Sequence, residues 1–269
     1  MWISLAVYAH YGVDSTRESY ILYVVNIWDL YIEKLMALAD NSDNQTLIGV
    51  IRRLPEGLVN RIAAGEVIER PASAIKELVE NSIDAGASRI DVIMREGGRT
   101  LMTVTDNGCG MSREELSLSI ERHATSKLPD DNLTQINTLG FRGEALPSIA
   151  SVSRMEMMSR SRDSEDAWRI VIEGGLAAEP VPATIKSGTR VEIRDLFYAT
   201  PARLKFLKTV KTEFNLAADV IRKLAMANPE IAFTFGDGER TSIRLNVVQG
   251  DFLETNLARL ADCLLYTSD

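Results

Sequence analysis

Residues 71–85 constrain the fold most, because wound as an α-helix at about 100° per residue they sort into two faces. Pro71 suits the first helical position, where a missing N–H costs nothing. Gly86 suits the left-handed position after the last turn. The apolar face holds Ile75, Leu78, Val79, Ser82 and Ile83. The opposite arc holds Glu77, Glu80, Asn81 and Asp84. The sequence therefore predicts an amphipathic helix from Pro71 to about Ala85.

The polar arc is open to two interpretations. It could be a solvated surface face, as on most helices. However, it contains no lysine or arginine, so we expect its acids to repel one another without a cationic i,i+4 partner. Glu77 and Asn81 also stand one turn apart, which sets a carboxylate base beside a neutral oxygen ligand suited to Mg²⁺. From the pattern alone, a surface face and a functional face both remain possible.

A β-hairpin follows the helix. Residues 90–95 and 101–105 read as strands, and Gly97-Gly98 between them is a turn signal. Because these strands pair antiparallel, we expect the helix to pack on a mixed or antiparallel sheet rather than a doubly wound one. Asp106 ends the second strand and opens Asp-Asn-Gly-Cys-Gly-Met, which is either a tight turn or a binding loop. A carboxylate there can accept from the amine of adenine, whereas guanine presents an oxygen and would leave it unpaired.

Gly140-Phe141-Arg142-Gly143 leads into a predicted helix start at Glu144. Backbone N–H groups of such a turn, with a helix end behind them, bind phosphate oxygens. The segment matches neither the Walker A nor the dinucleotide-binding pattern, and a glycine turn that only caps a helix remains the other interpretation. The polar stretch 123–132, with Thr125, Ser126 and Lys127, is either a surface loop or a lid.

Four stretches in this order resemble the MutL family of DNA mismatch-repair proteins within the GHKL ATPases. They are residues 65–73, 76–87, 140–146 and 197–207. The resemblance spans roughly Ile51 to Val248 and implies an α+β fold, a two-layer sandwich with a mixed, mostly antiparallel sheet of the Bergerat type. It also implies ATP and Mg²⁺ as ligands.

The resemblance gives each candidate residue a role. Glu77 is the expected general base, and Asn81 is the expected ligand of Mg²⁺. Asp106, Gly110 and Thr189 are expected in the adenine pocket. Seven residues are expected near the phosphates: Thr125, Ser126 and Lys127 in the lid, and Gly140, Phe141, Arg142 and Gly143 in the glycine turn.

Three domain segments are expected. Residues 1–50 are an uncertain extension with a possible amphipathic helix, 51–227 are the ATP-binding domain, and 228–269 open an incomplete second domain with a ribosomal-protein-like βαβ fold. The family uses a lysine from later in that second domain on the γ-phosphate, and no residue here matches it. The function that the resemblance implies is a slow, ATP-hydrolysing switch of DNA mismatch repair. A nucleotide-binding module that does not hydrolyse ATP is the first alternative, and a topoisomerase ATPase subunit is the second.

Composition limits the partners. The net charge is −8, yet residues 188–223 carry eight Lys and Arg against four acids, which indicates either a DNA-facing surface or a solvated helix face. Two distant cysteines and two histidines favour neither a zinc site nor disulfides, which fits a reducing cytosol. With the resemblance, the expected location is the bacterial cytoplasm, in association with the nucleoid. The apolar run 20–28 is shorter than the ~20 residues of a membrane span. The resemblance implies weak, non-specific DNA binding, a MutS-type mismatch sensor, a downstream endonuclease or helicase, and homodimerisation on ATP binding.

Overall fold

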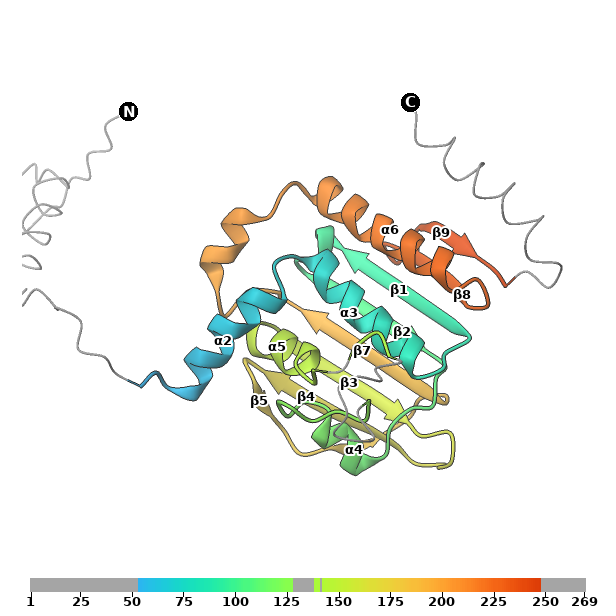
Figure 1. Cartoon of the computed structure of the whole chain (residues 1–269), viewed down its shortest axis with the longest axis horizontal. Helices are drawn as coiled ribbons and strands as arrows, with labels where there is room; N and C mark the ends of the chain where they lie inside the picture. The colour runs from blue at the N-terminus through green and yellow to red at the C-terminus, as the bar shows by residue number, and fades with distance from the viewer. Residues whose placement is uncertain (1–52, 128–137, 141, 248–269) are drawn as a thin grey trace, which may run out of the picture. The chain divides into compact units, whose positions relative to one another are not determined.

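The computed structural model describes residues 53–127, 138–140 and 142–247 (Figure 1). Its α-helices are α2 (Glu56–Val67), α3 (Pro71–Asp84), α4 (Arg113–Leu118), α5 (Ala145–Val152) and α6 (Val210–Ala227). Two 3-10 turns are η1 (Glu96–Gly98) and η2 (Pro201–Phe206). The strands are β1 (Arg89–Arg95), β2 (Leu101–Asp106), β3 (Arg154–Arg160), β4 (Ala167–Glu173), β5 (Leu176–Ala177), β6 (Val181–Ala183), β7 (Gly188–Arg194), β8 (Ala232–Gly236) and β9 (Thr241–Leu245).

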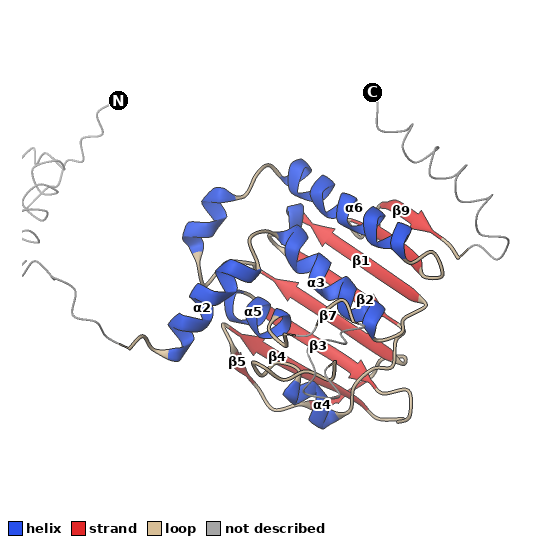
Figure 2. Ribbon diagram, in the orientation of Figure 1, coloured by secondary structure: helices blue, strands red, loops and turns tan. Residues whose placement is uncertain are grey.

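The strands form one sheet in the order β5-β4-β3-β7-β2-β1-β8-β9, with β6 also paired to β4. Every pairing is antiparallel except that of β1 with β8. Helices α3, α5 and α6 lie on one face of this sheet (Figure 2). The described part of the chain is therefore the two-layer α+β sandwich with a mixed, mostly antiparallel sheet that the sequence predicted.

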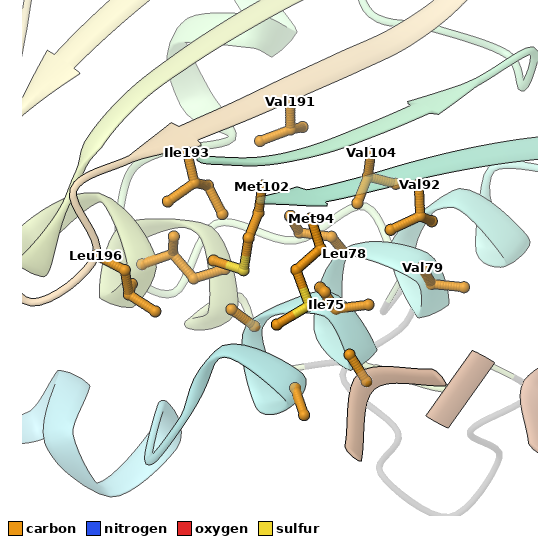
Figure 3. Close-up of a cluster of buried hydrophobic side chains, with 14 of the residues drawn as sticks. Ile75, Leu78, Val79, Val92, Met94, Met102, Val104, Val191, Ile193 and Leu196 are labelled. Carbon is orange, nitrogen blue, oxygen red and sulfur yellow. The ribbon is translucent and has the colours of Figure 1, made fainter. Parts of the chain in front are cut away.

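Helix α3 lies over the middle of the sheet and confirms the helix predicted from the two-faced pattern. Pro71 occupies the first helical position, and Gly86 takes a left-handed φ of 67° just beyond the last turn. Ile75, Leu78 and Val79 are at most 2% exposed. They face side chains of β1, β2 and β7, including Met94, Met102 and Val191 (Figure 3). Burial of this stripe fixes the polar arc of the helix on the side away from these strands.

The hairpin of β8 and β9 corrects the domain boundary expected at residue 228. β8 pairs parallel with β1, from Arg89 opposite Ala232 to Ile93 opposite Gly236, so the hairpin extends the same sheet. Phe235 is fully buried, and its ring centroid lies 4.6 Å from that of Phe214 on α6. Without β8, the outer edge of β1 would leave its backbone N–H and C=O groups unpaired, and the apolar face of α6 would be uncovered. Both therefore need this strand, which explains why the hairpin belongs to the first domain. The rest of the expected second domain, and the extension 1–50, lie outside the described residues.

Local backbone features set the ends of two further helices. α6 starts at Val210, because the Thr209 side chain caps it by accepting from the Thr212 N–H at 3.2 Å. α4 ends at Leu118. The chain then turns, and His123 adopts a left-handed φ of 65° that no helix allows. Among the described residues, no helix is both long and apolar enough to cross a membrane.

Candidate functional site

Glu77 lies on the polar side of α3 with 32% of its side chain exposed. Partial burial raises the pKa of the Glu77 carboxyl, while the positive charge of Lys76 acts in the opposite direction. Lys76 also lies 2.6 Å from Glu80, one turn further along the helix. The premise that the acids of this arc lack a cationic partner is therefore wrong, because the long side chain of Lys76 reaches them from the edge of the arc.

Asn81 and Asp84 share a single cation from a distant part of the sequence. The ammonium of Lys127 donates to Asn81 Oδ1 at 2.7 Å and to Asp84 Oδ2 at 2.6 Å. The Asp84 side chain is 8% exposed and that of Lys127 is 19% exposed. A carboxylate this buried needs a partner, so Lys127 stabilises it directly. The structure thus brings together Lys127 and Asn81, two residues that the sequence assigned to one nucleotide site.

Asp106 is the last residue of β2, and its side chain contacts Ser82 on α3. Its Oδ2 accepts from the Ser82 hydroxyl at 2.9 Å, and its Oδ1 accepts from the backbone N–H groups of Gly108 at 2.9 Å and Thr189 at 3.2 Å. Burial raises the pKa of Asp106 despite these three hydrogen bonds. The donors fix the carboxylate in one orientation, so its remaining acceptor capacity has a defined direction.

Thr189 lies directly beside Asp106 at the start of β7. Its hydroxyl oxygen is 2.9 Å from that of Ser159 on β3, which also accepts from the Met111 N–H at 2.8 Å. Gly188 takes a φ of 114°, and a Cβ there would lie 2.1 Å from the Asp106 carbonyl oxygen. This close approach of β7 to β2 needs glycine, and it sets Thr189 next to the carboxylate.

Gly110 is also held by its backbone. It has a φ of 69°, and an added Cβ would lie 2.0 Å from the carbonyl oxygen of Arg160 at the end of β3. The neighbouring Asn107 side chain accepts from the N–H groups of Ser88 and Arg89, both at 2.9 Å. The loop after Asp106 is therefore fixed on both sides, to β3 and to the turn that follows α3.

The glycine turn packs against the start of the predicted lid. The Gly143 carbonyl accepts from the His123 N–H at 3.2 Å, and a Cβ on Gly143 would lie 2.5 Å from the Ala124 carbonyl oxygen. The Leu139 N–H donates to Asp84 Oδ1 at 3.1 Å, so Asp84 binds both Lys127 and the segment leading into Gly140. Helix α5 begins at Ala145, immediately beyond the turn.

The remaining candidates divide into three groups. Thr125 accepts from the Lys127 N–H at 3.1 Å and so shapes the bend in which Lys127 lies. Ser126 and Arg142 are exposed. Phe141 lies outside the described residues.

The side chains of Asn81 and Asp84 suit a metal ion that also binds a second molecule, such as a nucleotide. Within the described ranges, no cluster of three or more His, Cys, Asp and Glu residues could enclose a metal ion. Asn81 and Asp84 nevertheless present, one turn apart on α3, oxygen atoms that can bind a metal ion. Mg²⁺ prefers oxygen, keeps several waters, and is bound through one or two protein side chains together with phosphates. These two residues therefore fit Mg²⁺ whose other ligands come from a nucleotide and water.

Sequence reasoning missed three contributors to this cluster: Ser82, Asp84 and Ser159. Ser82 lies on the apolar face of α3. Because a serine on a buried face needs a hydrogen-bond partner, its position there is the signal that could have revealed its role. Ser159 carried the same signal on an alternating strand. Asp84 was recognised as polar, but its two partners come from residues 43 and 55 positions away.

Comparison with known proteins shows the family to which the chain belongs. Residues 68–175 match the sequence family described as histidine kinase-, DNA gyrase B- and HSP90-like ATPase. Over 211 residues the chain is 61% identical to the DNA mismatch repair protein MutL of Paramagnetospirillum magneticum, covering 78% of this chain and 35% of that protein. It is 62% identical over 214 residues to MutL of Rhodospirillum rubrum, covering 80% of this chain and 34% of that protein. The chain belongs to the MutL family.

Solved structures give the same family. The Aquifex aeolicus MutL ATPase domain complexed with ADP has a TM-score of 0.57 and 33% sequence identity, covering 68% of this chain and 66% of that one. The crystal structure of the N-terminal domain of a DNA repair protein has a TM-score of 0.61 and 28% identity, covering 74% and 59%. The described fold is thus that of the MutL ATPase domain, and the chain spans about a third of the length of the curated MutL relatives.

Proposed function

We propose that this chain binds ATP with Mg²⁺ and hydrolyses it slowly, as the switch of a MutL-type mismatch-repair protein. The observation that carries the proposal is the convergence of Asn81, Asp106 and Lys127, from three separate motifs, around one end of α3. The similar Aquifex aeolicus domain was solved with ADP, which supports a nucleotide as the ligand.

Adenine recognition is proposed for Asp106. Its carboxylate already accepts from Ser82 and from two backbone N–H groups, and one further acceptor position suits the exocyclic amine of adenine. Guanine carries an oxygen at that place, so GTP would leave a buried acceptor unpaired. Thr189, fixed by Ser159, contributes a hydroxyl to the same pocket.

The hydrolytic step is proposed for Glu77. Its raised pKa makes it a stronger base than an ordinary carboxylate, and it is placed one turn from Asn81 to orient and deprotonate water. Mg²⁺ bound at Asn81 would offset the phosphate charge. The backbone N–H groups between Gly140 and Gly143, at the N-terminal side of α5, would bind the triphosphate.

We propose that the lysine- and arginine-rich segment 188–223 binds DNA. Glu192 pairs with both Arg190 and Arg194, so part of the positive charge on β7 is offset. Three exposed lysines follow one another along this segment: Lys205 on η2, Lys208 between η2 and α6, and Lys211 in the first turn of α6. Phe206, next to Lys205 in the sequence, is 81% exposed. We assign weak, largely non-specific phosphate binding to this surface.

The wider role follows the family. We propose that ATP binding drives homodimerisation of this region, and that the nucleotide state is read by a MutS-type mismatch sensor and a downstream endonuclease or helicase, in the bacterial cytoplasm. The high identity to MutL proteins over 211 residues supports this role.

The test is the variant Glu77→Ala, with bound nucleotide and released phosphate measured separately. A general base contributes about 10²-fold or more, so phosphate release should fall at least that far while ATP affinity changes little. Glu165→Ala, on an exposed turn, is the matched control and should keep both. If the wild type binds ATP without releasing phosphate, the chain is the non-hydrolysing module. Full turnover in Glu77→Ala would refute the assignment of the base.

A further inference from the structure

The oxygen of Asn81 expected to bind Mg²⁺ is occupied by an ammonium group. Lys127 Nζ lies 2.7 Å from Asn81 Oδ1, the only metal-binding atom of that side chain. Mg²⁺ binds oxygen at about 2.0–2.1 Å. A divalent cation at Asn81 would therefore stand within a few ångströms of the Lys127 charge, where two cations repel strongly in a partly buried site.

Asp84 explains why the lysine stays there. Its carboxylate is 8% exposed, and its Oδ2 accepts from Lys127 Nζ at 2.6 Å. Its Oδ1 is engaged with the Leu139 N–H at 3.1 Å. Because a nearly buried carboxylate needs a countercharge, loss of Lys127 leaves Asp84 short of one unless another cation takes its place.

We propose that Lys127 is an internal cation that competes with Mg²⁺ for Asn81, and that Asp84 is the positioning residue that holds it there. One cation remains beside Asp84 in either state: the lysine without metal, and the metal after exchange. The lysine released in this way is free to reach a phosphate. This inference rests on the proposed function, since it concerns the metal of the same nucleotide site.

The test uses the metal alone, so it does not depend on nucleotide binding or hydrolysis. Mn²⁺ serves as the probe, and free Mn²⁺ is measured by electron paramagnetic resonance against the whole chain without nucleotide. Lys127→Met removes the competing charge and leaves Asp84 without a countercharge, so Mn²⁺ should bind about fivefold or more tightly than to wild type. Lys186→Met changes an exposed lysine in the same way and should leave Mn²⁺ binding unchanged.

A double variant separates competition from a general charge effect. Adding Asp84→Asn to Lys127→Met should remove the gain, because the carboxylate that attracts the metal is lost. In the wild-type chain, saturating Mn²⁺ should raise the rate of amine acetylation at Lys127 several-fold while the rate at Lys186 stays constant.

The proposal is overturned if Lys127→Met binds Mn²⁺ no more tightly than wild type. It is also overturned if the double variant keeps the full gain, or if saturating Mn²⁺ leaves the acetylation of Lys127 unchanged. These results would leave the nucleotide site itself intact. A wild-type chain that binds no ATP would instead remove the proposed function.

Discussion

At the scale of single residues, the site is organised by pairs that join separate motifs. Ser82 orients Asp106, Ser159 holds Thr189, and Asp84 holds Lys127. The first member of each pair is set by a helix or strand, and the second is the residue we assign to the nucleotide. Rigid supporting groups of this kind fix an acceptor or donor in the orientation a ligand requires.

The raised pKa of Glu77 gives a prediction on pH dependence. The base acts only when ionised, so turnover at saturating ATP should fall as the pH drops through the Glu77 pKa, which burial places above that of an ordinary glutamate. Lys76 lowers that pKa, so Lys76→Met should move the acid limb of the pH–kcat profile to higher pH. A limb that moves to lower pH, or does not move, would contradict the assignment.

At the scale of elements, glycine conformation determines how α3 passes into the sheet. Gly86 turns the chain with a φ of 67° and has open space where a Cβ would lie. Gly143 and Gly188 have positive φ as well, but there the backbone of another segment also excludes a side chain. The first glycine is required by conformation alone, and the other two also by close packing.

The left-handed φ of Gly86 predicts that a glycine-to-alanine substitution has a different effect there than at Gly57, where an added Cβ also has open space. Gly86→Ala should lower the free energy of unfolding by about 1–2 kcal/mol, the cost of a left-handed residue with a Cβ. Gly57→Ala, in the first turn of α2 and also free of contacts, should leave it equal or raise it by up to about 1 kcal/mol. Urea unfolding measures both, and equal effects would show that Gly86 does not need its left-handed conformation.

The sequence could predict α3 closely because Pro71, Gly86 and the apolar stripe agree with one another. It could predict the roles of Glu77, Asn81 and Asp106 only as hypotheses, because each residue type also suits an ordinary surface or turn. The salt bridge of Lys127 with Asp84, and the parallel pairing of β8 with β1, join positions far apart in the sequence. No local pattern carries such pairings, so the boundary at residue 228 was misplaced.

At the scale of the whole described part of the chain, one sheet joins β1 and β2, which follow α3, to the hairpin of β8 and β9. β8 and β9 close the edge beside β1, and Phe235 packs under α6. The hairpin should therefore unfold together with the nucleotide site rather than as a separate domain.

Phe235→Ala tests this unity. Removing a fully buried ring should cost about 3–5 kcal/mol and shift a single cooperative transition that includes the site. Phe206→Ala removes an exposed ring, 81% accessible, and should change the unfolding free energy by less than about 0.5 kcal/mol. If Phe235→Ala melted the hairpin alone and left the rest of the transition in place, the hairpin would be an independent unit.

The central claim is that α3, the end of β2 and the glycine turn before α5 enclose one nucleotide. The most direct measurement is an experimental structure of this chain with ADP and Mg²⁺. The account predicts the adenine amine within hydrogen-bond distance of the Asp106 carboxylate, the metal at Asn81, and the phosphates at the backbone of Gly140–Gly143. Nucleotide bound elsewhere, or Glu77 and Asn81 facing open solvent in the complex, would contradict it.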